Sequence, residues 1–201
     1  MSGPETEIAE VRRAEAGWNR VFYCYAPYLG LGLLLSAVIP EHGLTWPPLQ
    51  ALVDMVARIV PSIDRLAVFS PSPKMTRAFG ALMWLALPVF TVWACLRAPR
   101  VPRRVMPWST LLLTMPAAAV VLALVGVAAP FFFIADAREP GYLGGRGSAG
   151  LAFLIRSRTG HGTLGSVMFA FCSFSLVFLW RVALDYPRLL AYNFTRRSDT
   201  K

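Results

Sequence analysis

Charged residues are scarce in this 201-residue sequence, at 15% of the chain, and it contains only two histidines and three cysteines. Soluble domains carry about 25% charged residues and 45–50% apolar ones, whereas 56% of this chain is hydrophobic. A soluble fold of this size could not bury so much apolar surface. The composition therefore argues against a soluble domain and predicts an all-α integral membrane protein.

Charge is absent altogether from four long apolar segments. An uncharged apolar segment of roughly 18 or more residues is long enough to cross the hydrocarbon core as a helix. The four predicted transmembrane helices are 21–39, 78–96, 108–135 and 162–180, the third lying within the longest uncharged stretch, 105–135. We expect the first to be a retained anchor, because its apolar stretch exceeds that of a typical signal peptide and no clean cleavage site follows it.

The segments outside the predicted spans differ in their positive charge, which sets orientation in a membrane. They are an N-terminal segment (1–20), a first outer loop (40–77), a basic loop (97–107), a glycine-rich outer loop (136–161) and a basic tail (181–201). The basic loop holds four arginines and no acid: Arg97, Arg100, Arg103 and Arg104. We therefore expect the loop and both termini to be cytoplasmic, although the outer loops also carry basic residues.

Two further inferences follow from composition. The net charge of +9 would suit a nucleic-acid partner. The basic residues flank the predicted spans, however, so no nucleic-acid partner is predicted. High usage of alanine, arginine, leucine and proline is typical of a GC-rich bacterium and favours the bacterial inner membrane.

The first outer loop contains a predicted amphipathic helix at about 48–68. Pro47 and Pro48 suit a helix start, apolar residues then recur at helical spacing, and Pro61 breaks or kinks the run. The segment is too short to span, so we expect it to lie at the membrane interface or to cap the bundle. The alternative is a docking surface for a partner, formed by Leu49, Leu52, Val53, Val56 and Arg58.

Small residues recur along the spans at four-residue spacing, which allows helices to approach closely. The predicted helix-packing residues are Gly32, Ser36, Ala119, Ala123, Gly162, Ser166 and Ala170. We expect these stripes to close the bundle internally rather than to bind another protein. Pro88, Pro116 and Pro130 predict kinks in the second and third spans.

Residue types that carry chemistry are missing from the predicted spans. Ionisable residues inside a membrane usually mark function, and their absence weighs against proton-coupled transport and catalysis. The segment 145–150 matches the letters G-x-G-x-x-G, but it follows a spanning helix rather than a strand, so no dinucleotide site is predicted. We predict no enzyme activity, no cofactor and no metal.

His42 and His161 both lie at the outer ends of spans. If the first and fourth spans were neighbours, the two imidazoles could approach each other and ligate a metal or haem. We expect instead that both are exposed loop residues without a role.

These observations predict a non-catalytic polytopic membrane protein that acts by contact, as an accessory, assembly or regulatory subunit of an envelope complex such as a secretion or conjugation apparatus. Its expected partners are the lipid bilayer and a membrane protein or a second copy of the chain. The main alternative is an immunity-type membrane protein that neutralises a pore-forming toxin. Less favoured are a small transporter or channel, and a haem or metal protein that uses His42 and His161.

Overall fold

The computed structural model describes residues 4–102, 106–132 and 157–198, and the regular secondary structure in these ranges is helical throughout. Four helical stretches are long and apolar enough to cross a membrane: Arg12–Val38, Pro73–Arg97, Thr110–Ala128 and Arg158–Thr195. The predicted all-α architecture with four spans is therefore confirmed. It is the architecture of an integral membrane protein.

The first and last helices extend well beyond the predicted spans. Helix α1 covers Pro4–Val38, and α9 covers Ser166–Ser198, preceded without a break by α8 (Arg158–Gly160) and a π-helical turn, η3 (His161–Gly165). The fourth span was predicted to end at Trp180 because Arg181 follows it, but the helix continues to Ser198. A charged side chain ends an apolar run without breaking the backbone hydrogen bonds.

The third span is not a regular α-helix. It consists of η1 (Thr110–Thr114), α5 (Met115–Val121), η2 (Leu122–Ala128) and α6 (Ala129–Phe132), of which η1 and η2 are π-helical. A proline has no backbone N–H and cannot complete the regular ladder, and α5 and α6 each contain one near their start. No pattern in the sequence predicts the π-helical turns. Residues 133–135 of the predicted span and the glycine-rich segment 145–150 lie outside the described residues.

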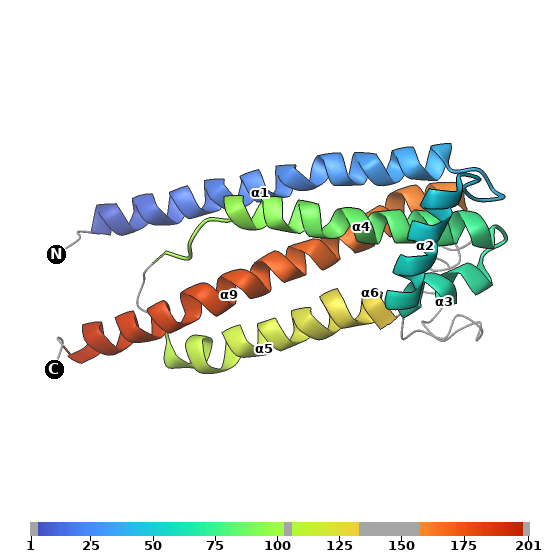
Figure 1. Cartoon of the computed structure of the whole chain (residues 1–201). Helices are drawn as coiled ribbons and strands as arrows, with labels where there is room; N and C mark the ends of the chain where they lie inside the picture. The colour runs from blue at the N-terminus through green and yellow to red at the C-terminus, as the bar shows by residue number, and fades with distance from the viewer. Residues whose placement is uncertain (1–3, 103–105, 133–156, 199–201) are drawn as a thin grey trace.

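The helices run nearly side by side and define two ends (Figure 1). Helix α9 packs against α1, against α4 (Pro73–Arg97) and against η2, so it lies at the centre of the bundle. The chain termini and the connection from α4 to η1 lie at one end, which we call the terminal end (Figure 1). The opposite end, the cap end, carries the two helices of the first outer loop.

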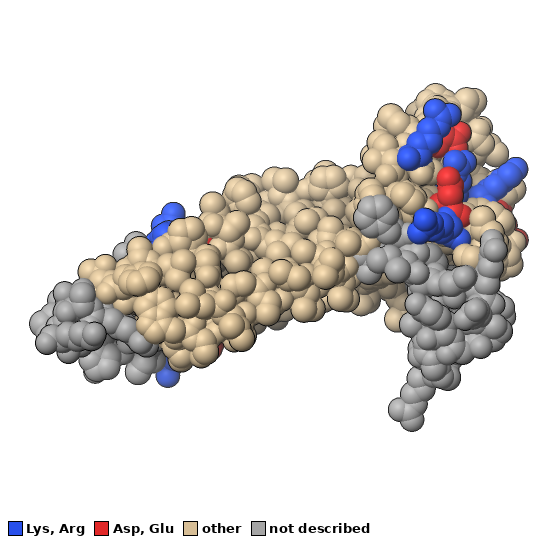
Figure 2. Space-filling view, turned by 90° about the horizontal axis from the view of Figure 1, so that it is seen from below, with Lys and Arg blue, Asp and Glu red and all other residues tan. Residues whose placement is uncertain are grey.

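The cap consists of α2 (Pro47–Ile59) and α3 (Pro61–Phe69), in the region of the helix predicted at about 48–68 with a break or kink at Pro61. The two are separated at Val60, whose extended backbone (φ −112°, ψ 97°) precedes Pro61. A residue before proline is driven out of the helical region by the proline ring, which explains the division. Both helices pack on α4, and charged side chains gather over the cap while the shaft is nearly free of them in the view of Figure 2.

Candidate functional site

The closest helix contact joins α1 to the start of the fourth span through four of the predicted packing residues. A Cβ atom added at Gly32 would overlap Ser166 Oγ, and one added at Gly162 would overlap Ser36 Oγ. Two glycines therefore each accommodate a serine of the other helix. Ser166 is fully buried, and its hydroxyl has no hydrogen-bond partner among the described residues. This pairing explains why small residues are required at these positions.

The other predicted packing residues belong to the third span and to α9. Ala119, Ala123 and Ala170 are half-buried. Another close contact was missed in the sequence: a Cβ atom at Gly126 would overlap Ser175 Oγ. It repeats the glycine-against-serine arrangement, although Gly126 does not continue a four-residue stripe from Ala119 and Ala123.

The third span is the least buried of the four. In the most apolar 18 residues of the third span, 11% of residues are buried, against 33%, 33% and 28% in the corresponding stretches of the first, second and fourth spans. Its neighbour along its length is α9, and α6 reaches α3 at the cap end. Leucines and valines cover the side away from α9; the most exposed are Leu112, Leu113, Val120, Val121, Leu124 and Val125, each at least 56% exposed.

An arginine of α4 ties the two cap helices together. Arg77 Nη1 donates to Asp54 Oδ1 of α2 at 2.6 Å, and Arg77 Nε donates to Asp64 Oδ1 of α3 at 2.7 Å. Arg58 lies four residues after Asp54 in the same helix, a spacing at which the two could pair. Asp54 is bound by Arg77 instead. One guanidinium thus bridges three helices.

The residues predicted as a candidate partner surface are mostly used inside the molecule. Val53 and Val56 are buried in the core shared with α4, and Leu49 and Leu52 are half-buried. Only Arg58 is exposed. The reason is that α4 covers the apolar face of α2. The apolar side chains that the cap does expose are others, namely Trp46, Met55, Ile59 and Val68.

His161 is buried, contrary to the expectation of an exposed loop residue. It lies in η3 with 6% of its surface exposed. Its Nδ1 is 2.8 Å from the carbonyl oxygen of Ser157, and its Nε2 is 3.1 Å from Thr76 Oγ1. Thr76 Oγ1 in turn donates to Ser70 Oγ at 2.7 Å. The prediction failed because the helix begins before His161, so that the side chain faces α4.

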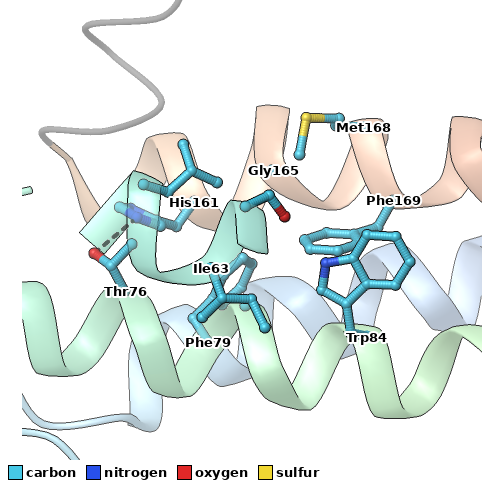
Figure 3. Close-up of a pocket in the computed structure, with 11 residues that line it drawn as sticks. Ile63, Thr76, Phe79, Trp84, His161, Gly165, Met168 and Phe169 are labelled. Atoms are coloured by element: carbon cyan, nitrogen blue, oxygen red, sulfur yellow. Dashed lines mark hydrogen bonds between the residues drawn. The ribbon is translucent and has the colours of Figure 1, made fainter. Parts of the chain in front are cut away.

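A small, mostly apolar cavity adjoins this polar chain between α3, α4 and α9 (Figure 3). Aromatic rings form much of its wall: Phe79 meets His161 edge to face at 5.5 Å, and Trp84 meets Phe169 in the same way at 5.6 Å. His161 and Thr76 are the polar groups at one end of it (Figure 3). This arrangement fixes the imidazole in the packed core.

His42 does not join His161. It is exposed and lines a separate polar recess, with Asp54, Lys74 and Arg77 among its neighbours. Gly43 follows it with φ +85°, a conformation that favours glycine, and this turn directs the chain into the cap. The two histidines predicted as a potential ligand pair therefore line different pockets.

The terminal end holds a polar cluster that sequence reasoning missed. Arg181 Nη2 donates to the carbonyl of Ala98, Asp185 Oδ2 accepts from Val101 N at 3.0 Å, and Asn193 Oδ1 accepts from Met106 N at 3.1 Å. All three side chains belong to α9, and all three partners are backbone groups of the connection between α4 and η1. Spacings of four and eight residues put the three side chains on one face of α9, a pattern visible in the sequence once the helix is extended past Arg181.

The arginines of the predicted basic loop have different environments. The guanidinium of Arg97 lies 4.3 Å from the centre of the Trp93 ring, a cation–π contact. Arg100 lines an open pocket together with Arg13 of α1 and Arg188 of α9. Arg103 and Arg104 lie outside the described residues.

The described residues thus offer a lightly packed third span, a cap held in place by Arg77 and a basic pocket at the terminal end.

Comparison of the chain with protein-family models, curated proteins and solved structures gave no match.

Proposed function

We propose that this protein is a non-catalytic subunit of a membrane complex, and that it binds a membrane-spanning helix of another protein along the outward face of its third span. The observation that carries the proposal is the packing of that span, which is 11% buried where the other three are 28–33% buried. A span held by one long neighbour has room for a second.

The chemistry of the exposed face supports contact with a helix. Lipid tails are as apolar as leucine, so helices associate in a bilayer through close packing rather than through burial of apolar surface. Leu113, Ala117, Val121 and Leu124 follow one another at spacings of three or four residues, and all are exposed. Ala117 makes a gap between larger neighbours, into which a side chain of a partner helix can fit.

The backbone of the third span also supports the proposed contact. Its two π-helical turns depart from regular helical geometry, and such turns occur frequently at functional sites. Thr114 is exposed within this span, and its Oγ1 lies 3.5 Å from the carbonyl oxygen of Ser109. A hydroxyl that makes so long a bond is available to a partner.

We further infer that the terminal end faces the cytoplasm of a bacterial cell and that the protein resides in the inner membrane. The support is the concentration of arginine in the basic loop and beside both termini, since positive residues are retained on the cytoplasmic side.

Photo-crosslinking in native membranes tests the proposed contact. A photoreactive amino acid is placed at Leu113, Ala117 or Leu124 in the full-length chain, and adducts are identified by mass after irradiation. Val89 and Val92 of α4 are the control positions, because they too are exposed apolar residues of a span.

The expected result is a protein adduct of one defined mass from the third span and none from α4. An adduct with twice the mass of the chain would identify a second copy as the partner. Adducts from neither set, or equal adducts from both, would contradict the proposal.

A further inference from the structure

The pocket at the terminal end brings together three arginines from three separate segments. Arg13 comes from α1, Arg100 from the connection after α4, and Arg188 from α9. Ala14, Pro99, Val101 and Pro102 complete the lining, and the space between them is about 800 Å³, including the open mouth. Like charges that line one pocket repel one another unless an anion lies between them.

Positive charge predominates around this pocket. Arg188 Nη1 lies 3.1 Å from Asp185 Oδ1, so one of the three arginines has a carboxylate beside it. Among the side chains that the structure describes, no carboxylate forms an ion pair with Arg13 or Arg100. Two positive charges are therefore left for a ligand.

The wall that carries Arg100 is held in place on two sides. Asp185 Oδ2 binds Val101 N from α9. On the α1 side, Pro99 lies so close to Gly17 that a Cβ atom there would be 2.7 Å from Pro99 Cβ. A loop fixed between two helices presents its arginine without the full entropic cost of ordering a flexible segment on binding.

The pocket lies outside the apolar segments, beside the end of a predicted spanning helix. The uncharged stretch of α1 begins after Arg20, and α4 ends at Arg97, next to the pocket. Trp93 stacks under Arg97 at this level, and tryptophan prefers the interface between the hydrocarbon core and water. Guanidinium groups bind phosphate oxygens through two parallel hydrogen bonds.

We propose that this pocket binds a phosphate group, of the kind carried by the headgroup of an anionic membrane lipid. Arg13 and Arg100 supply the uncompensated charge, Arg188 completes the ring, and the proline and alanine side chains contact the apolar part of the ligand. Basic pockets between spanning helices are known to select such headgroups. The inference does not depend on the partner proposed for the third span.

Lipid titration of the full-length protein in an uncharged detergent tests the site. The midpoint of thermal unfolding is measured as phosphatidylglycerol is added, with phosphatidylcholine and inorganic phosphate as separate arms at constant ionic strength. The test variant is Arg13→Gln with Arg100→Gln. The matched control, Arg12→Gln with Arg20→Gln, removes two exposed arginines of α1 that do not line the pocket.

We expect phosphatidylglycerol to raise the midpoint equally in the wild type and in the control. In the test variant, at least fivefold more lipid should be needed for half of the shift. Should the double variant fail to fold, each single substitution is expected to give part of this loss.

An equal shift with inorganic phosphate, lost in the same variant, would support the site and assign it to a soluble phosphate compound. Equal losses in the test and control variants would show that only net charge matters, and no shift with any ligand would show that the pocket is empty; both would overturn the proposal.

Discussion

His161 Nε2 lies 3.1 Å from Thr76 Oγ1, although the two residues are 85 positions apart in the chain. The contact joins the beginning of α4 to the beginning of the fourth span. Both ring nitrogens are engaged, because Nδ1 faces the carbonyl oxygen of Ser157. The imidazole therefore acts as a buried link between two helices at the cap end.

Replacing this link should destabilise the bundle. His161→Ala removes a buried ring and its hydrogen bond to Thr76, and the lost hydrogen bond and lost packing together should cost about 1–3 kcal/mol. His42→Ala is the control, since its exposed ring should change the free energy of unfolding by no more than about 0.5 kcal/mol. Denaturant unfolding in detergent measures both. Equal losses for the two variants would refute the role assigned to His161.

The sequence predicted the four spans because their signal, a long uncharged segment, depends on length and composition alone. The small-residue stripes were informative for the same reason, since Gly32 and Ser166 follow a spacing that any helix must have. The position of His161 could not be derived in this way. It depends on where the helix begins and on which helix lies opposite, and neither is written in the local sequence.

The polar residues of α9 were missed for a different reason. The change in composition at Arg181 predicts that the fourth span ends at Trp180, which places Asp185 and Asn193 in a tail instead of on one face of a helix. Their partners are backbone groups, which no pattern of side chains reveals. Likewise the sequence predicts that Val53 belongs to the apolar face of an amphipathic helix, but it cannot show that α4 covers this face.

The contact between Gly32 and Ser166 gives a sharp mutational test with a built-in control. Gly32→Ala places a methyl group against the serine, and overpacking of this kind costs about 1–3 kcal/mol. Gly30, in the same helix, has no atom within 4 Å of the position its Cβ would take, so Gly30→Ala should be neutral or stabilising by up to about 1 kcal/mol. A comparison of unfolding in detergent decides the matter. A Gly32→Ala variant as stable as Gly30→Ala would mean that the helices can separate without cost.

Asp185 should govern the order of the connection after α4. Its side chain is 3% exposed and its Oδ2 accepts from Val101 N. Asp185→Ala removes this acceptor, so hydrogen exchange at Val101 should become at least tenfold faster and the free energy of unfolding should fall by about 1–3 kcal/mol. Glu15→Ala, which removes an exposed acid of α1, should change neither. Unchanged protection at Val101 would show that other contacts hold the connection.

Arg77→Gln should loosen the cap with little effect on the bundle. The guanidinium and both of its aspartate partners are 35–53% exposed, so screening by water limits the loss of global stability to about 1 kcal/mol or less. Amide exchange in α2 and α3 should nevertheless accelerate. Arg58→Gln serves as the control for charge, since Arg58 is exposed and makes no ion pair with a described aspartate. Identical exchange in the two variants would exclude a clamping role for Arg77.

Thiol labelling tests the inferred orientation. A cysteine introduced by Arg100→Cys should react with a membrane-impermeant maleimide in inverted vesicles but not in intact cells, while Trp46→Cys in the cap should do the opposite. The chain without either substitution measures the background from its three native cysteines. Labelling of the Arg100→Cys protein from outside intact cells would reverse the assignment.

The dependence of the third span on α9 also fixes an order of events during synthesis. α1 and α4 can pair as soon as both have left the ribosome, and Tyr28 can then donate its hydrogen bond to the carbonyl of Met83. The third span emerges next, but its main neighbour has not yet been made. It therefore enters the membrane before the last helix does. During that interval its exposed faces can contact any other newly inserted chain.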